Sequence, residues 1–174
     1  SQSMPAPNDP TKRKRLAEIS AKLGGIYGKG KSCDEQGKCR TLGELSKVMA
    51  TSRDYDALLE AWTGWRTVSP EMRPMYAEFV SIANEGAKEV GFDNLGELWR
   101  AAYDMSPAEF EAESDRLWQD VKPLYDQLHC YVRAKLAKTY GEAKVDPKGK
   151  IPAHLLGNMW AQEWMNIYPL VEPY

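Results

Sequence analysis

The sequence predicts an all-α protein. Apolar residues recur at three- and four-residue steps, helix start signals can be named for several segments, and no segment shows the alternation of a β-strand. With 174 residues the chain has about the length of one domain, enough to bury a sizeable core. No internal repeat or low-complexity segment suggests another architecture.

The N-terminal part is the least specified. Residues 1–25 are predicted to be a tail and a short helix near residues 13–23, which Gly24 and Gly25 are expected to end. The tail is basic, but no apolar run of the kind found in a signal peptide follows it. No stretch approaches the roughly 18 apolar residues that cross a bilayer, so we expect no membrane segment in this chain.

From Thr41 onward the sequence predicts one helix after another. Thr41 is followed three residues later by Glu44, which is the pattern of a capping box. A further helix is predicted to begin with Ser69 as N-cap and Pro70 as first helical residue. Gly91 is expected to end that helix.

The longest predicted helix begins with a capping box formed by Ser106 and Glu109 and ends at Tyr140, before Gly141. Pro123 lies inside it and predicts either a kink or two abutting helices. Apolar residues mark one stripe along this helix, namely Leu117, Val121, Leu124, Leu128, Tyr131 and Leu136. That stripe is predicted to face the core.

The last predicted helix covers residues 153–168 and is apolar over a wide arc. Leu156, Trp160, Trp164 and Ile167 form one stripe, and further apolar residues lie off it. A helix of this kind is typical of the deep interior of a large protein. Either it is the central helix of a small bundle, or its other neighbours lie outside this chain.

The net charge of −2 indicates neither a nucleic-acid partner nor a membrane surface. Two of the three cysteines, Cys33 and Cys39, lie in the turn-rich loop CDEQGKC and form either a local disulfide or two free thiols. A zinc site would need two more ligands nearby, and none exist. Cys130 stands alone and is predicted to be a buried apolar filler.

No complete catalytic constellation is present in the sequence. His129 and His154 are each expected to be ordinary core or surface residues, and His129 diverges too far from Cys130 on a helix to activate it. Carboxylates such as Glu111 and Asp115 fit a solvated helix face better than acid–base catalysis. The tryptophans are predicted to be core residues. Spacing places Gln162 away from the tryptophan stripe, either in solvent or as an amide donor on a cleft wall.

Several stretches resemble the angiotensin-converting-enzyme family of zinc peptidyl-dipeptidases. They are VMATSRDYDALLEAWTGWR (48–66), LWRAAYDM (98–105), PLYDQLHCYVRAKLAKTYG (123–141) and IPAHLLGNMWAQEWMNIY (151–168). The resemblance runs from about residue 26 to residue 173. It implies a larger, mostly helical peptidase with a cleft, of which residues 26–174 are an internal part that lacks the N-terminal lid and the zinc-binding HExxH half.

The resemblance also implies roles for single residues. Gln162 matches a glutamine that helps to bind the C-terminal carboxylate of the peptide substrate, and Trp160 lines the same wall. Arg66 matches an arginine that binds chloride, and Tyr103 matches the tyrosine of a second chloride site. The CDEQGKC loop is similar to the first disulfide loop of the family, which implies a bond between Cys33 and Cys39.

Two positions receive no role from the resemblance. Glu163 lies where family members vary near the second primed subsite, so its role is left undecided. The family places an acidic residue of the first primed subsite near TLGE, but the match needs a gap there, so we assign no such role to Glu44.

We therefore expect this chain to be the substrate- and chloride-binding part of a zinc dipeptidyl carboxypeptidase that releases C-terminal dipeptides. The zinc ligands would lie outside the chain, which would be inactive without the remaining half of the peptidase. A disulfide implies an oxidising compartment, so we expect a secreted, periplasmic or extracellular location. The alternative is a non-catalytic helical interaction module derived from that fold, which would bind a partner protein through its wide apolar face.

Overall fold

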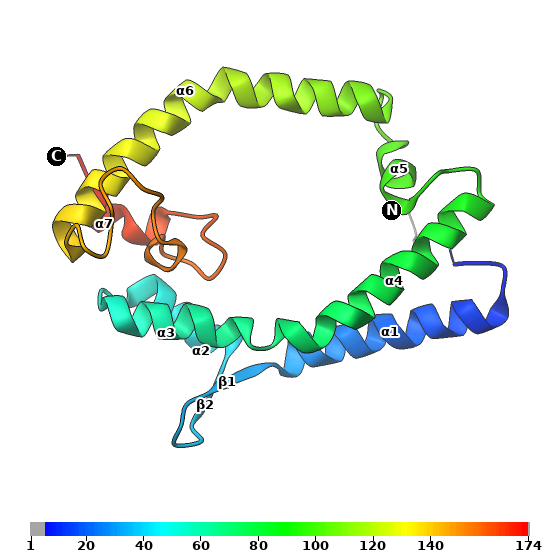
Figure 1. Cartoon of the computed structure of the whole chain (residues 1–174), viewed down its shortest axis with the longest axis horizontal. Coiled ribbons are helices and arrows are strands. Elements are labelled where there is room, and N and C mark those ends of the chain that lie inside the picture. The colour runs from blue at the N-terminus through cyan, green and yellow to red at the C-terminus, as the bar shows by residue number, and fades with distance from the viewer. Residues whose placement is uncertain (1–5, 174) are drawn as a thin grey trace. The chain divides into compact units, whose positions relative to one another are not determined.

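The computed structural model describes residues 6–173 and confirms the all-α prediction. The elements in chain order are α1 (Pro10–Lys29), β1 (Lys31–Cys33), β2 (Cys39–Thr41), α2 (Leu42–Thr51), α3 (Tyr55–Arg66), α4 (Ser69–Glu89), α5 (Leu95–Arg100), α6 (Pro107–Tyr140), two 3₁₀ turns (Ala153–Leu155 and Met165–Ile167) and α7 (Tyr168–Val171) (Figure 1). No helix within the described residues is both long and apolar enough to cross a membrane.

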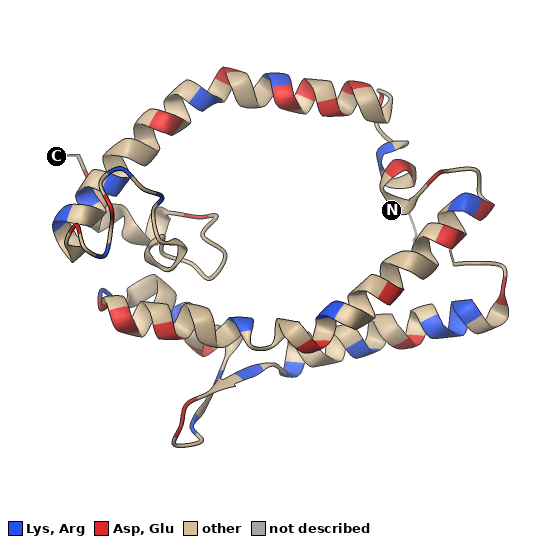
Figure 2. Cartoon of the chain, viewed as in Figure 1, with Lys and Arg blue, Asp and Glu red and all other residues tan. Residues whose placement is uncertain are grey.

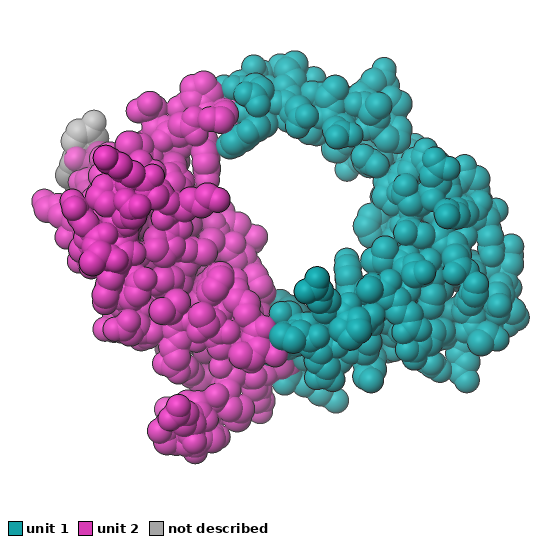
Figure 3. Space-filling model, in the orientation of Figure 1, with its two compact units in different colours: residues 1–29, 68–120 teal, residues 30–67, 121–174 magenta. Residues whose placement is uncertain are grey.

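The chain divides into two compact units (Figure 3). Unit 1 comprises residues 1–29 and 68–120, and unit 2 comprises residues 30–67 and 121–174. The boundary between residues 120 and 121 falls inside α6. Acidic residues predominate in the first part of α6 and basic residues in its last turns, whereas α4 carries both signs along its length (Figure 2).

In unit 1, α1 packs along α4 (Figure 1). The buried residues of this core are Leu16, Ile19 and Leu23 from α1, Ile82 and Ala83 from α4, and Leu95 from α5. Arg15 Nη2 lies 2.6 Å from Glu78 Oε2, and a second ion pair joins Lys12 to Glu85. Because these charged groups are exposed to solvent, the ion pairs contribute little to stability, and the apolar contacts dominate.

The predicted end of the first helix is wrong, because α1 continues through Gly24 and Gly25 to Lys29. Each glycine costs about 1 kcal/mol relative to alanine inside a helix. Burial of the apolar face of α1 against α4 outweighs that local cost. The helix begins where Asp9 Oδ1 accepts a hydrogen bond from the backbone N–H of Thr11 at 2.7 Å.

Two of the predicted helix starts are confirmed and one is shifted. Thr41 and Glu44 form the capping box of α2. Ser106 Oγ accepts from the Glu109 backbone, and Glu109 accepts from the backbone N–H of Ser106 at 2.8 Å. The N-cap of α4 is Val68 and not Ser69. Val68 has φ −72° and ψ −34°, so the backbone is already helical before Ser69 and an extended cap cannot form there.

The long helix α6 has the predicted bounds, and Gly141 follows it with φ +91°. Pro123 lies inside one continuous helix, so there are not two abutting helices. The expectation that its apolar stripe is buried is wrong for most positions. Leu136 is buried, whereas the others are exposed: Leu117, Val121, Leu124, Leu128 and Tyr131.

Exposed tryptophans also depart from the prediction. Trp65 is buried, but Trp99, Trp118 and Trp160 are exposed large apolar residues. Helical spacing predicts which face is apolar, but burial also needs a neighbouring element that covers it.

The disulfide between Cys33 and Cys39 is present and closes the hairpin of β1 and β2. The strands pair antiparallel, with Lys31 opposite Thr41 and Cys33 opposite Cys39. At the turn, Asp34 Oδ1 accepts hydrogen bonds from the backbone N–H groups of Gln36 and Lys38 at 3.1 and 2.9 Å. The hairpin is therefore held by a covalent bond and by an aspartate turn.

The predicted helix over residues 153–168 is wrong. This segment of unit 2 contains two short 3₁₀ turns separated by an irregular loop, and α7 begins only at Tyr168. Gly157 has φ +88° and Ala161 has φ +57°, which an α-helix does not accommodate. The apolar residues Leu155, Leu156, Met159 and Ile167 are still buried, so burial is achieved here without helical periodicity.

Candidate functional site

The candidate site is built on residues 157–166, called here the Gln162 loop, which comprise irregular backbone and the start of the second 3₁₀ turn. Asn158 Oδ1 accepts hydrogen bonds from the backbone N–H groups of Trp160 at 3.0 Å and of Gln162 at 3.2 Å. Asn166 Nδ2 donates to the carbonyl oxygen of Gly157 at 2.9 Å, which joins the two ends of the loop. Side-chain amides therefore take the place of the helical hydrogen bonds that the sequence predicted.

Gln162 is exposed and lines a pocket in unit 2. The pocket has a volume of about 320 Å³, and its other lining residues are Tyr125, Leu128, Ala161 and Trp164. Trp164 Nε1 donates to the carbonyl oxygen of Ala161 at 3.3 Å. The rings of Tyr125 and Trp164 are 6.3 Å apart. The pocket thus combines one amide with an aromatic wall.

The structure corrects the predicted surroundings of Gln162. The sequence placed Gln162 away from both tryptophans, but Gln162 and Trp164 line the same pocket. Trp160 is 46% exposed and lies near Arg66. Because the loop is not a helix, the two tryptophans do not share one stripe.

Arg66, the last residue of α3, anchors the other side of the Gln162 loop. Its Nη2 donates to the carbonyl oxygen of Met159 at 2.8 Å, and its Nη1 donates to the carbonyl oxygen of Trp62 at 2.9 Å. The guanidinium carbon lies 3.6 Å from the centre of the Trp62 ring and 5.8 Å from that of Trp160. Partial burial lowers the pKa of Arg66, because the charged form loses hydration there. A partly buried positive charge thus lies beside Trp160.

The fourth predicted site residue, Tyr103, belongs to unit 1. It is 56% exposed, and its ring stacks on that of Phe110 with 4.5 Å between the centres. Gln162, Trp160 and Arg66 all belong to unit 2, where Arg66 and Trp160 are in contact. The structure therefore brings three of the four predicted residues into one unit.

Comparison with known proteins decides the family. The family model described as Angiotensin-converting enzyme matches residues 1–174. The chain belongs to the angiotensin-converting enzyme family. Similar proteins include Angiotensin-converting enzyme-like protein Ace3 of Mus musculus, which is 45% identical over 150 residues and aligns with 85% of this chain and 20% of its own length.

Two further relatives show what share of a longer family member this chain covers. Angiotensin-converting enzyme of Bos taurus is 41% identical over 174 residues, which are 98% of this chain and 13% of that protein. Angiotensin-converting enzyme of Theromyzon tessulatum is 42% identical over 165 residues, which are 91% of this chain and 26% of that protein. The chain thus spans between an eighth and about a quarter of these relatives.

The residues described in this family member do not fit a zinc site. Within residues 6–173, no three His, Cys, Asp or Glu side chains come together in a way that could hold a metal ion. Glu44 is engaged in the capping box of α2, and Glu163 is exposed. Glu111 and Asp115 lie exposed on α6, as expected for a solvated helix face.

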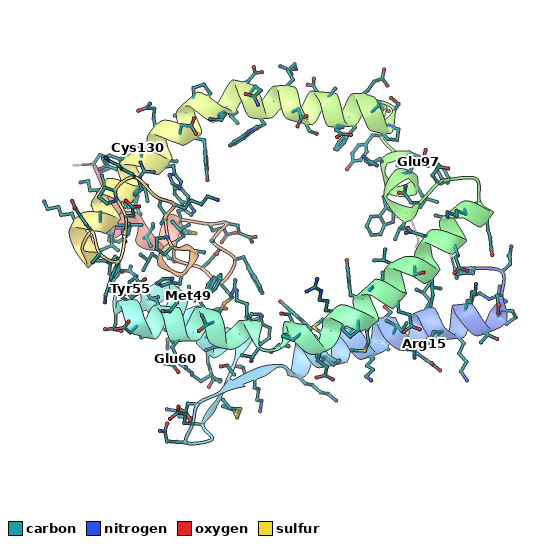
Figure 4. The ribbon with its side chains drawn as sticks, viewed as in Figure 1. Arg15, Met49, Tyr55, Glu60, Glu97 and Cys130 are labelled. Carbon is teal, nitrogen blue, oxygen red and sulfur yellow. A yellow bond between two sulfur atoms is a disulfide. The ribbon has the colours of Figure 1, made fainter. Side chains whose placement is uncertain are left out.

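The lone cysteine and the two histidines differ in their surroundings. Cys130 lies on α6 and is exposed, so the prediction of a buried filler is wrong (Figure 4). His129 is half-buried, and its ring lies 6.4 Å from that of Trp164. His154 is only 5% exposed, and its ring meets that of Tyr55 edge-on at 4.6 Å. His154 Nε2 is buried and has no hydrogen-bond partner in the part of the chain that the structure describes.

We expect the stability of the protein to fall between pH 7.5 and pH 5.5 because of His154. Burial lowers the pKa of His154, and the nearby Asp56 carboxylate opposes this only in part. Below the usual histidine pKa of about 6.5, the unfolded chain binds a proton that folded His154 does not bind. The free energy of unfolding therefore decreases as the pH is lowered, by at most about 1.4 kcal/mol per pH unit for this one group.

Thermal unfolding at both pH values measures the effect. The variant His154→Phe, which cannot titrate, should lose most of the dependence of the melting temperature on pH in this window. The carboxylates whose pKa values are lowered by hydrogen bonding, such as Glu44 and Glu109, titrate below it. If the melting temperature of His154→Phe depends on pH as strongly as that of the wild-type protein, His154 is not the cause of the pH dependence.

Sequence reasoning missed the residues that shape the loop. Asn158 and Asn166 were given no role, and neither was Arg53, whose Nη2 donates to the carbonyl oxygen of Asn166 at 2.7 Å. One signal was present, because a Gly-Asn pair at positions 157 and 158 is typical of a turn and interrupts the predicted helix. The contact of Arg53 with a residue 113 positions away has no local signal.

Proposed function

We propose that this chain is the substrate- and chloride-binding part of a zinc dipeptidyl carboxypeptidase. Membership of the angiotensin-converting enzyme family supports a peptidase. The observation that carries the proposal is Gln162, whose exposed side chain lines a pocket within a hydrogen-bonded loop. The zinc ligands would belong to a part of the protein outside this chain.

In this proposal the side-chain amide of Gln162 donates a hydrogen bond to the C-terminal carboxylate of the peptide. The family resemblance gives Trp160 a place on the same wall, but the tryptophan that lines the pocket of Gln162 in the described chain is Trp164. Hydrogen bonds to a charged acceptor are among the stronger ones in proteins. A carboxylate held at a fixed distance from the reacting bond determines the length of the product, so Gln162 would contribute to the release of dipeptides. Gln162 acts in binding and not in the chemical step.

Arg66 is the proposed chloride ligand of unit 2, and Tyr103 is the proposed ligand of a second chloride site. The environment of Arg66 supports an anion, because its charge is partly buried against the ring of Trp62. In addition, the indole N–H of Trp62 is buried and finds no acceptor among residues 6–173. Both sites would need further ligands from outside the chain.

The exposed apolar residues of α6 support a further part of the proposal. Leu117, Val121, Leu124 and Leu128 would be covered by the remaining half of the peptidase. The same residues favour the second candidate function, a non-catalytic interaction module that binds a partner protein. The disulfide supports a secreted, periplasmic or extracellular location.

The variant Gln162→Ala of the full-length protein tests the proposal. Loss of a hydrogen bond to a charged group costs about 1.5–3 kcal/mol, so we expect the KM for a peptide with a free C-terminus to rise about 10- to 100-fold. The kcat should change much less, because the bond is present in both the ground state and the transition state. Steady-state kinetics of dipeptide release measure both constants.

Gln36→Ala is the matched control, because Gln36 is an exposed glutamine of the hairpin turn and has no proposed contact with substrate. An unchanged KM in Gln162→Ala would remove the assignment of Gln162. Failure of the full-length wild-type protein to release C-terminal dipeptides would leave the interaction module as the function.

A further inference from the structure

The Gln162 loop has little regular secondary structure of its own, so its conformation depends on side chains. Residues 156–164 lie between the two 3₁₀ turns. The backbone N–H groups of Trp160 and Gln162 both donate to one oxygen, Asn158 Oδ1, at 3.0 and 3.2 Å. A carboxamide oxygen has two lone pairs, so these two donors use its full capacity.

Ala161 shows why this support matters. It lies between the two bonded residues and has φ +57°, a left-handed backbone that alanine rarely adopts. Such a conformation persists only where the surroundings enforce it. Because the N–H groups of Trp160 and Gln162 flank Ala161, their common acceptor holds the backbone on both sides of the strained residue.

A second set of bonds joins the two ends of the loop and fastens one of them to the connection between α2 and α3. Asn166 Nδ2 donates to the carbonyl oxygen of Gly157 at 2.9 Å. Arg53 Nη2 donates to the carbonyl oxygen of Asn166 at 2.7 Å, and its Nη1 donates to that of Ser52 at 2.8 Å. These contacts fix where the loop begins and ends, whereas Asn158 fixes the turn inside it.

We propose that Asn158 is a positioning residue that directs the side chain of Gln162 into its pocket. Without the Asn158 carboxamide, Ala161 keeps only the long bonds from its N–H to the Asn158 carbonyl oxygen and from Trp164 Nε1 to its own carbonyl oxygen, both at 3.3 Å. The strained φ is then less firmly held, and the direction of the Gln162 side chain changes. The affinity for a peptide carboxylate falls although Asn158 itself touches no substrate. This inference rests on the proposed role of Gln162, but the hydrogen bonds of Asn158 are testable independently of that role.

Hydrogen exchange of the full-length protein tests the positioning step without reference to activity. In Asn158→Ala the amides of Trp160 and Gln162 should exchange about tenfold faster, because both lose their acceptor. Asn158→Asp should restore the slow exchange, since a carboxylate oxygen accepts the same two bonds. Unchanged exchange in Asn158→Ala, or no restoration in Asn158→Asp, would overturn the proposal.

Asn94→Ala provides a matched control in unit 1. Asn94 Oδ1 accepts from the backbone N–H of Glu97 at 2.9 Å as the N-cap of α5, so the variant removes the same kind of bond elsewhere. It should leave the exchange of the Trp160 and Gln162 amides unchanged. Faster exchange at both positions in Asn94→Ala would show that the effect is a general loss of stability, which would also overturn the proposal.

A double-mutant cycle on KM tests whether Asn158 acts through Gln162. For a peptide with a free C-terminus, we expect Asn158→Ala to raise KM about fivefold. Asn158→Ala combined with Gln162→Ala should have the KM of Gln162→Ala alone, because no amide remains to be positioned. If the two substitutions instead multiply their separate effects on KM, the proposal is overturned. If Gln162→Ala leaves KM unchanged, the proposed function fails, while the exchange experiment still decides whether Asn158 holds the loop.

Discussion

Replacing Leu155 by alanine is expected to lower the free energy of unfolding by about 2–5 kcal/mol. Leu155 is 1% exposed and is the last residue of the 3₁₀ turn before the Gln162 loop. Truncation removes buried apolar atoms and leaves a cavity, because the surrounding structure relaxes only in part. Urea unfolding of the protein, followed by circular dichroism at the helix band, measures the loss.

Leu124→Ala is the control for this experiment, since Leu124 is 75% exposed in the chain. A substitution at an exposed position of this kind changes the free energy of unfolding by at most about 0.5 kcal/mol. A loss below 1 kcal/mol in Leu155→Ala would contradict its place in the core. The same control can be repeated in the full-length protein. If Leu124→Ala there lowers the free energy of unfolding as much as Leu155→Ala does, the result would support the proposal that another part of the peptidase covers α6.

Gly157→Ala is expected to destabilise the protein by about 2–5 kcal/mol, as the sum of two costs. The first is the left-handed backbone of Gly157 at φ +88°, which costs an alanine about 1–2 kcal/mol. The second is crowding, because a Cβ there would lie 3.1 Å from Asn166 Cβ and 3.2 Å from Ile167 Cγ2. Overpacking of this kind costs about 1–3 kcal/mol. Denaturant unfolding again measures the loss.

Gly141→Ala separates the two costs. Gly141 has φ +91°, but a Cβ there would meet no atom within 4 Å. We therefore expect a loss of only about 1–2 kcal/mol in this control. Equal losses at the two glycines would show that crowding against Asn166 and Ile167 does not contribute.

The sequence predicted those parts of the fold that local chemistry determines. The capping boxes of α2 and α6 and the end of α6 at Tyr140 depend on residues a few positions apart, and all are confirmed. The Cys33–Cys39 disulfide, which the loop itself left open and the family resemblance implied, is also present. The end of α1 was not predictable in this way, because tertiary contact with α4 outweighs the preference of Gly24 and Gly25.

The segment after Leu155 shows a second limit of sequence reasoning. Its apolar spacing fits a helix, but the bonds of Asn158 and Asn166 and the backbone of Gly157 favour a compact irregular loop. Periodicity describes which residues are apolar and does not weigh such side-chain competition with the backbone. The exposed stripe of α6 shows a related limit. A periodic pattern predicts that a helix has an apolar face, but it does not predict which element covers that face.

The residues of the candidate site were predicted from a family resemblance, and the structure adds the contacts that hold them in place. Gln162, Trp160 and Arg66 were predicted, but the bonds from Arg66 to Met159 join residues 93 positions apart. No local pattern carries that information. The binding roles of Gln162, Trp160, Arg66 and Tyr103 are proposals, and the kinetics of Gln162→Ala test the first of them.

The Cys33–Cys39 disulfide has a practical consequence for handling the protein. It encloses the exposed turn that contains Asp34 and Gln36, so a protease that cuts this turn leaves the two pieces covalently joined. Such a nicked chain would keep its apparent mass on a non-reducing gel and would separate into two fragments only after reduction. Sample integrity around this hairpin therefore has to be judged under reducing conditions.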